Sequence, residues 1–329
     1  MSALDLPAVL EELRAARSSS GEPNTATMTL AVFVDDATVA TWARERVRAV
    51  ADKHPSRVIL LDATISEGTY HIGRASAHGD WLELGVAGTT PDHLVSMLET
   101  GSLPEAPMLL MWGGRQTASD QRFEPLARLA RTTICSTSMI ETDAAALRDL
   151  GLFVERQPNV TIADLAYLRL APWQECIAGF FDDPGQAAEL ARLEEIDIAC
   201  GSDAESYYFA CWLASRLGWS IAGPRTFSSE RGGHVALSIE RSGAARRMQR
   251  VTLRSKNGRF VAEVGHDDPD AIILESSIGK TQRHRCGPLG GVDIASLVER
   301  AILEGEGDRV FRDTLAVATE LLTYGAARS

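Results

Sequence analysis

The junction at residues 33–42, FVDDATVATW, has the position of a dinucleotide site, between an apolar run and a helical pattern. Dinucleotide binding needs glycines there, so that the backbone can approach the pyrophosphate. The junction has no glycine and carries Asp35 and Asp36. Carboxylates suit a helix N-terminus but repel a phosphate. Asp62 could imitate the ribose-binding acid, yet without glycines it adds little. The sequence therefore disfavours a nicotinamide cofactor, and we predict no cofactor.

A second polar cluster, SSIGKTQRHR, covers residues 276–285. Gly279, Lys280 and Thr281 resemble the end of a phosphate-binding loop, but such a loop needs a glycine at the position of Leu274. The basic side chains of this cluster are Lys280, Arg283, His284 and Arg285. The cluster is either a solvated turn or a contact for an anion or an acidic partner surface.

Other catalytic patterns are missing from the sequence. The seven histidines form no H-x-x-H or H-E-x-x-H set, which disfavours a metal site. No G-x-S-x-G elbow marks a serine nucleophile. The five cysteines include no C-x-x-C pair, so we predict free thiols. We therefore predict no catalytic residues, no metal and a protein that is not an enzyme.

Charge and hydropathy limit the partners. The net charge is −12, whereas nucleic acids and anionic membranes attract positive surfaces. No apolar run reaches the roughly 18 residues of a membrane-spanning helix. The first residues also lack the pattern of a secretory signal. We therefore expect a cytoplasmic protein that binds neither nucleic acid nor membrane.

The elements that position these residues fall into two halves. Residues 1–27 are expected to form a helix and a polar connector. Residues 28–155 contain continuous apolar runs, at 28–34 and 58–61 among others, that alternate with helical patterns. That alternation predicts an α/β domain, Rossmann-like but without the dinucleotide motif, with an open, mostly parallel sheet. We expect Val32, Val34, Val58, Ile59 and Leu60 to be buried.

Residues 156–329 have a different pattern. Several runs between 234 and 279 have hairpin character, and Asn257-Gly258 indicates a tight turn with positive φ. Helical patterns flank these runs, so we predict an α+β domain with a largely antiparallel sheet. Residues 202–219 are expected to form a helix closed by Gly218, and its apolar residues, among them Trp212 and Leu213, should pack on that sheet. If Trp212 is fully buried, Trp212→Ala should cost about 3–5 kcal/mol.

The densest segment is DLAYLRLAPWQECIAGFFDDP, residues 164–184. Leu170, Trp173 and Ile177 recur at helical spacing and give one apolar face. Pro172 indicates a kink or a second helix start. The segment is either a core helix or, because arginine and aromatic residues are mixed in it, part of a partner-binding surface.

With this segment the chain resembles the OpcA family, the glucose-6-phosphate dehydrogenase assembly proteins of bacteria. The residues that match the family pattern are Asp164, Leu165, Arg169, Leu170, Trp173, Phe180, Phe181 and Asp182. Tyr167 replaces a tryptophan of the pattern, and Gln174 replaces an arginine. Further matches, in the family's order, are residues 54–61, 107–114, 209–219 and 307–322.

The resemblance implies a non-catalytic protein that binds glucose-6-phosphate dehydrogenase and favours its active oligomer. The competing hypothesis is an α/β enzyme that binds a sugar phosphate or nucleotide, or a metabolite sensor. Arg169→Ala should weaken partner activation and leave the melting temperature nearly unchanged. The candidate partner-binding residues are Arg169, Trp173, Tyr167, Gln174, Lys280, Arg283 and Arg285.

Overall fold

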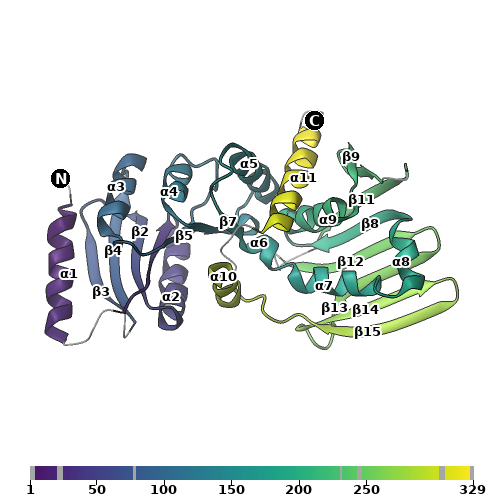
Figure 1. The fold of residues 1–329 in the computed structure, drawn as a ribbon, viewed down its shortest axis with the longest axis horizontal. Coiled ribbons are helices and arrows are strands. Elements are labelled where there is room, and N and C mark those ends of the chain that lie inside the picture. Colours follow the sequence, from purple (N-terminus) through teal and green to yellow (C-terminus); the bar gives the residue numbers. More distant parts are fainter. Residues whose placement is uncertain are drawn as a thin grey trace. The chain divides into compact units, whose positions relative to one another are not determined.

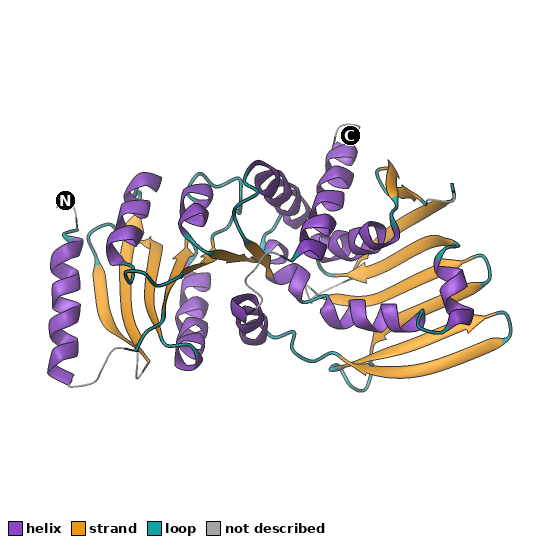
Figure 2. Cartoon of the chain, viewed as in Figure 1, coloured by secondary structure: helices purple, strands orange, loops and turns teal. Residues whose placement is uncertain are grey.

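The computed structural model describes residues 4–20, 25–76, 79–229, 232–242, 247–303 and 308–326, so part of the predicted N-terminal connector, residues 21–24, lies outside it. The chain divides into two compact units, each built around one large sheet (Figures 1 and 2). The first unit contains Met1–Ser136, Arg156–Ala163 and Val298–Glu306; the second contains Thr137–Glu155, Asp164–Leu297 and Gly307–Ser329. The boundaries after residues 27 and 155 stay predictions.

The sheet of the first unit has seven strands in the order β3-β4-β2-β1-β5-β6-β7. Neighbouring strands from β4 to β6 pair in parallel, and β3 pairs antiparallel with β4. The open, mostly parallel sheet is thus confirmed. The strands are β1 (Met28–Val34), β2 (Ser56–Ser66), β3 (Tyr70–Ser76), β4 (Gly79–Ala87), β5 (Met108–Gly113), β6 (Thr132–Cys135) and β7 (Ile162–Asp164).

Helices cover this sheet because its central strands are apolar on both faces. Strand β1 is buried at every position, and Val58, Ile59 and Leu60 of β2 are at most 1% exposed, as predicted. The chain reverses its direction across the sheet between β4 and β5, so right-handed connections put α2 on one face and α3 and α4 on the other. The helices are α1 (Leu6–Ser20), α2 (Ala37–Lys53), α3 (Pro91–Gly101) and α4 (Phe123–Leu129).

The sheet of the second unit has eight strands in the order β15-β14-β13-β12-β8-β11-β10-β9. All neighbours pair antiparallel except β8 and β11, which are parallel, so the largely antiparallel sheet is confirmed. The strands are β8 (Leu193–Cys200), β9 (Ser220–Gly223), β10 (Thr226–Ser228), β11 (His234–Arg241), β12 (Met248–Ser255), β13 (Gly258–Val264), β14 (Ala271–Ile278) and β15 (Thr281–Pro288).

The turn between β12 and β13 differs from its prediction. Neither Asn257 nor Gly258 has a positive φ. Instead the hydroxyl of Ser255 accepts a hydrogen bond from the backbone N–H of Gly258 (2.9 Å), which closes the turn without left-handed backbone. The turn between β14 and β15 does use a left-handed glycine, Gly279, at φ 58°.

Helices of the second unit lie in front of its sheet in Figure 2. Helix α7 packs on β13, β14 and β15, and α9 packs on β8 and β11. Ser202 caps α9 at its start, and Gly218 ends it in the left-handed conformation at φ 65°. The helical elements are η1 (Thr137–Met139), α5 (Asp143–Arg156), α6 (Leu165–Leu168), α7 (Ala171–Phe180), α8 (Pro184–Leu190), α9 (Asp203–Leu217), α10 (Ile294–Leu303) and α11 (Arg309–Ala326).

Trp212 on α9 is only half-buried, so the condition of full burial is not met, whereas Leu213 is buried at 4% exposure. The ring of Trp212 packs 5.5 Å from the ring of Phe209, which takes the fully buried position. We therefore expect Trp212→Ala to lower the free energy of unfolding by about 1–2 kcal/mol, and Phe209→Ala to lower it by about 3–5 kcal/mol. Urea unfolding of both variants checks this, and equal losses would contradict it.

Among the described residues, every helix is too short or too polar to cross a membrane.

Candidate functional site

The first place to seek a ligand is the crevice at the carboxyl ends of β1 and β5, where the strand order reverses. Asp35 and Asp36 follow β1, and Arg115 follows β5. The backbone N–H of Arg115 donates to Asp35 (2.8 Å), and its guanidinium donates to Asp36 (2.8 Å). Arg122 also donates to Asp35 (3.1 Å). Paired carboxylates and guanidinium groups therefore line this crevice.

This crevice does not fit a dinucleotide. The carboxylate of Asp36 accepts from the backbone N–H groups of Thr38 (2.8 Å) and Val39 (3.2 Å), the first-turn donors that would otherwise face a phosphate. The bond from Val39 and the bond from Arg115 hold the pKa of Asp36 below its usual range, so the carboxylate is charged. A cofactor phosphate placed here would be repelled by the carboxylate of Asp36, and no glycine-rich backbone is present to bind the phosphate.

The described part of the chain gives little evidence for a metal site or a reactive thiol. No group of three His, Cys, Asp or Glu side chains there is arranged to hold a metal ion. The five cysteines are free, as their spacing predicts. Burial, together with the charge of Glu205, raises the pKa of Cys200 to about 12, and burial also raises the pKa of Cys211. These two thiols are therefore protonated and unreactive at neutral pH.

Asp164 anchors the segment that resembles the family pattern. Its buried carboxylate accepts from the backbone N–H groups of Ala166 (2.9 Å) and Thr137 (3.1 Å). It also accepts from the hydroxyls of Thr137 (2.6 Å) and Tyr208 (2.9 Å). Burial raises the pKa of Asp164, and these four donors act in the opposite direction. The carboxylate thereby ties the start of α6 to η1 and to α9.

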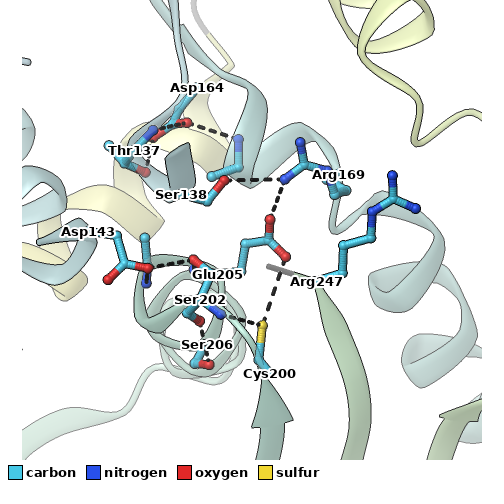
Figure 3. A network of polar contacts seen from close by, with 12 residues as sticks. Thr137, Ser138, Asp143, Asp164, Arg169, Cys200, Ser202, Glu205, Ser206 and Arg247 are labelled. Carbon is cyan, nitrogen blue, oxygen red and sulfur yellow. Dashed lines mark hydrogen bonds and ion pairs between the residues drawn. The ribbon is translucent and has the colours of Figure 1, made fainter. Parts of the chain in front are cut away.

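Arg169 follows α6 and points into the second unit (Figure 3). Its Nη1 forms an ion pair with Glu205, whose side chain is fully buried, and donates to the hydroxyl of Ser138 (3.3 Å). Burial raises the pKa of Glu205, and the guanidinium of Arg169 opposes that effect. The Nε of Arg169 is enclosed and has no hydrogen-bond partner among the described residues. The guanidinium thus holds Glu205 with one nitrogen and leaves donors unused.

The start of α9 fixes Glu205 in this position. The hydroxyl of Ser202 accepts from the backbone N–H of Glu205 (3.2 Å) and donates to the buried carboxylate of Asp143 (2.8 Å). Figure 3 shows these side chains on the opposite side of Glu205 from Arg247. The helix cap therefore fixes the backbone of Glu205, while Arg169 holds its carboxylate.

A pocket of about 210 Å³ lies beside this pair, within the second unit. Arg169, Glu205, Arg247 and Gln249 give it a polar side. The remaining lining residues are apolar: Leu170, Trp173, Met248, Val264, Pro269, Leu289 and Val292. The lining contains two arginines and one carboxylate, so its charged groups carry a formal surplus of one positive charge.

The structure places most predicted residues of the segment in the interior. Tyr167 is 6% exposed and packs against the rings of Tyr208 (5.5 Å) and Phe311 (5.1 Å). Trp173 is 2% exposed, and Gln174 is half-buried. Arg169 is 8% exposed and pairs with a buried carboxylate, so we now expect its removal to lower the melting temperature, contrary to the expectation from the sequence. The role of these residues in partner binding stays a prediction.

The predicted basic residues are exposed on β15 and its turn. Arg283 forms an ion pair with Asp183 (2.6 Å), and this guanidinium lowers the pKa of Asp183. The side chains of Lys280 and Arg285 form no hydrogen bond or ion pair with the described residues. Arg285 borders a hollow that is also lined by Cys176 of α7. The structure thus brings residues 280–285, the basic turn, next to the end of the 164–184 segment.

Sequence reasoning missed Glu205, Arg247 and the buried serines of the network. The spacing of Ser202 and Glu205 is that of a capping box, which identifies a helix start. Nothing in that signal indicates that Glu205 pairs with Arg169, which lies 36 residues away along the chain. Arg247 carried no signal beyond its charge.

The fold is shared with solved oxidoreductases. A 3-ketoreductase from Actinomadura kijaniata, KijD10 in complex with TDP-benzene and NADP, superposes with a TM-score of 0.56 at 11% identity over 90% of this chain and 96% of that one. Levoglucosan dehydrogenase in complex with NADH and L-sorbose gives 0.51 at 9% identity over 93% and 97%. At such identities the likeness shows the fold alone.

The proteins that are similar in sequence differ from these structural neighbours. Residues 160–315 match a family described as the C-terminal domain of a glucose-6-phosphate dehydrogenase subunit. A Nostoc punctiforme protein, "Putative OxPP cycle protein OpcA", is 31% identical over 256 residues, 72% of this chain and 52% of the relative. A Synechocystis protein of the same description is 29% identical over 56% of this chain and 38% of the relative. The chain thus spans about half or less of these relatives' length. The family match and the similarity to these relatives support membership of the chain in the OpcA family.

Proposed function

We propose that this chain is a non-catalytic, cytoplasmic partner of glucose-6-phosphate dehydrogenase that favours the active oligomer of that enzyme. The observation that carries the proposal is the match of residues 160–315 to a family described as a domain of a subunit of this dehydrogenase. That range contains the anchored 164–184 segment, its buried ion pair and the basic turn.

The charge pattern of the first unit supports a role without catalysis. In oxidoreductases of this fold class, the crevice at the strand reversal holds a dinucleotide. Here Asp35 and Asp36 occupy that crevice, paired with Arg115 and Arg122. An enzyme that uses a nicotinamide is therefore the less favoured candidate. A titration with NADP tests that alternative, and saturable binding that Asp36→Ala strengthens would favour it.

The accessible contact surface that we propose joins the exposed side of α7 to the β14–β15 turn. Lys280, Arg283 and Arg285 are exposed there, Gln174 is half-buried on α7, and α7 packs directly on β15. Arg169, Tyr167 and Trp173 would contribute from within, because they fix the position of α6 and α7. The unpaired positive charges of Lys280 and Arg285 suit an acidic patch on the partner.

The test is a titration of the dehydrogenase from the same cell with this protein, following its activity and its mass in solution. We expect activation together with a shift to the larger oligomer. Arg285→Glu should raise the half-activating concentration by about ten-fold or more, as hot-spot changes do. The matched control is Arg46→Glu, an equal charge reversal at an exposed position of α2.

The two parts of the proposal fail differently. If the unaltered protein changes neither activity nor mass, the partner role is wrong. If the unaltered protein activates and Arg285→Glu behaves like Arg46→Glu, the role holds and the contact surface is wrong.

A further inference from the structure

The pocket beside Arg169 has features of a ligand site that the proposed partner role does not use. Both of its arginines keep donors that no described residue satisfies. Arg169 uses only its Nη1, on Glu205 and Ser138. Its Nε is buried without a partner. An enclosed guanidinium nitrogen without an acceptor is unusual, because buried polar groups are nearly always paired.

The unused donors of Arg169 have a defined geometry. A guanidinium is planar, and its Nε and Nη2 project from one edge in a fork that matches the two oxygens of a carboxylate or phosphate. The pairs with Glu205 and Ser138 use the other end of the group and hold its plane in place. Arg169 also lines the pocket. Its position is therefore fixed before any ligand arrives.

Arg247 supplies the second positive charge. It precedes β12, its side chain is exposed, and this side chain forms no hydrogen bond or ion pair with any described residue. Figure 3 shows its guanidinium beyond Arg169, away from the network of Asp143, Ser202 and Ser206. Because Arg169 offsets the charge of Glu205, the charge of Arg247 is the uncompensated one in the lining.

The remaining walls limit what can bind. A volume of about 210 Å³ is below the roughly 300–1,000 Å³ of pockets for drug-sized ligands, so a nucleotide is too large. Trp173 and Leu289 are among the apolar residues of the lining. Such a lining suits a molecule of a few carbon atoms with one charged end.

We propose that this pocket binds a small organic anion, a carboxylate or a phosphate ester, whose charged end lies between Arg169 and Arg247 and whose carbon atoms contact Trp173. Glu205 does not repel this anion, because its own carboxylate is neutralised by Arg169. Binding would satisfy the buried guanidinium and would connect β12 to the 164–184 segment. The chain would then respond to a metabolite as well as to a protein partner, and this inference does not depend on the partner role.

The test uses the full chain and calorimetric titration with lactate, glycerol 3-phosphate and inorganic phosphate, with glycerol as the neutral probe. We expect saturable binding of at least one anion at concentrations up to about 10 mM, and none of glycerol. Arg247→Gln should weaken that binding by about ten-fold or more, because a hydrogen bond between charged groups is lost. Arg247 lies outside the buried network, so this variant should fold.

Arg259→Gln is the matched control, since it removes the same charge from an exposed position of β13 that does not line this pocket. Its binding should equal that of the unaltered protein. A preference for lactate or for glycerol 3-phosphate assigns the head group, and either preference supports the site. No saturable binding of any anion, or an equal loss in Arg247→Gln and Arg259→Gln, would overturn the proposal.

Discussion

Arg169→Ala is expected to lower the free energy of unfolding by about 3–5 kcal/mol, because it leaves the buried carboxylate of Glu205 without its counter-charge. The side chain of Glu205 is fully buried, so water cannot replace the guanidinium. The hydroxyl of Ser138 remains nearby but cannot neutralise a charge. Urea unfolding followed by circular dichroism measures the loss.

A paired replacement separates lost charge balance from lost packing. Arg169→Met combined with Glu205→Leu removes both charges, so it should recover most of the stability that Arg169→Ala loses. The exposed control Arg259→Ala should stay within about 0.5 kcal/mol of the unaltered protein. A loss of similar size for Arg259→Ala, or no loss for Arg169→Ala, would show that the ion pair does not stabilise the fold.

Asp164→Ala should lower the free energy of unfolding by at least about 3 kcal/mol, because it leaves several buried donors without an acceptor. The backbone N–H and hydroxyl of Thr137, the hydroxyl of Tyr208 and the backbone N–H of Ala166 all donate to this carboxylate. Each buried donor left without an acceptor costs about 1–3 kcal/mol. Thermal and urea unfolding of the full chain provide the measurement.

Asp164→Asn and Tyr208→Phe show which of these bonds matter. The amide keeps one acceptor oxygen and can still cap α6, so Asp164→Asn should lose clearly less than Asp164→Ala. Tyr208→Phe removes a single donor and should lose about 1 kcal/mol. If Tyr208→Phe matched Asp164→Ala, the hydroxyl rather than the helix cap would be the stabilising contact.

The fold could be predicted to a considerable extent from local patterns. The apolar runs of β1 and β2 and the helix between them follow from hydrophobic spacing, and the caps at Asp36, Thr90 and Ser202 follow from residue type. The conformation of the turn at Asn257 was not predicted correctly, because the hydroxyl of Ser255 closes this turn without left-handed backbone. The degree of burial of Trp212 could not be predicted, because hydrophobicity indicates that a side chain prefers burial but not how completely its neighbours cover it.

The candidate site could be predicted less well than the fold from local sequence patterns. Arg169 was singled out by its residue type, which predicts an exposed interface residue as readily as a buried ion pair. Its partner Glu205 is distant along the chain, and their contact depends on how α9 packs beside α6. The pocket likewise requires residues from separate strands and loops, and Arg247 joins it only through the fold. Long-range packing of this kind leaves no periodic signal in a sequence.

The interleaving of the two units along the chain has a consequence for synthesis on the ribosome. The first unit takes most of its residues from the first 136 but also includes Val298–Glu306, and Glu299 forms an ion pair with Lys53 of α2 (2.6 Å). The first unit therefore cannot reach its final state until nearly all of the chain has been translated. A nascent chain stopped before residue 298 would present an incomplete first unit to chaperones and proteases.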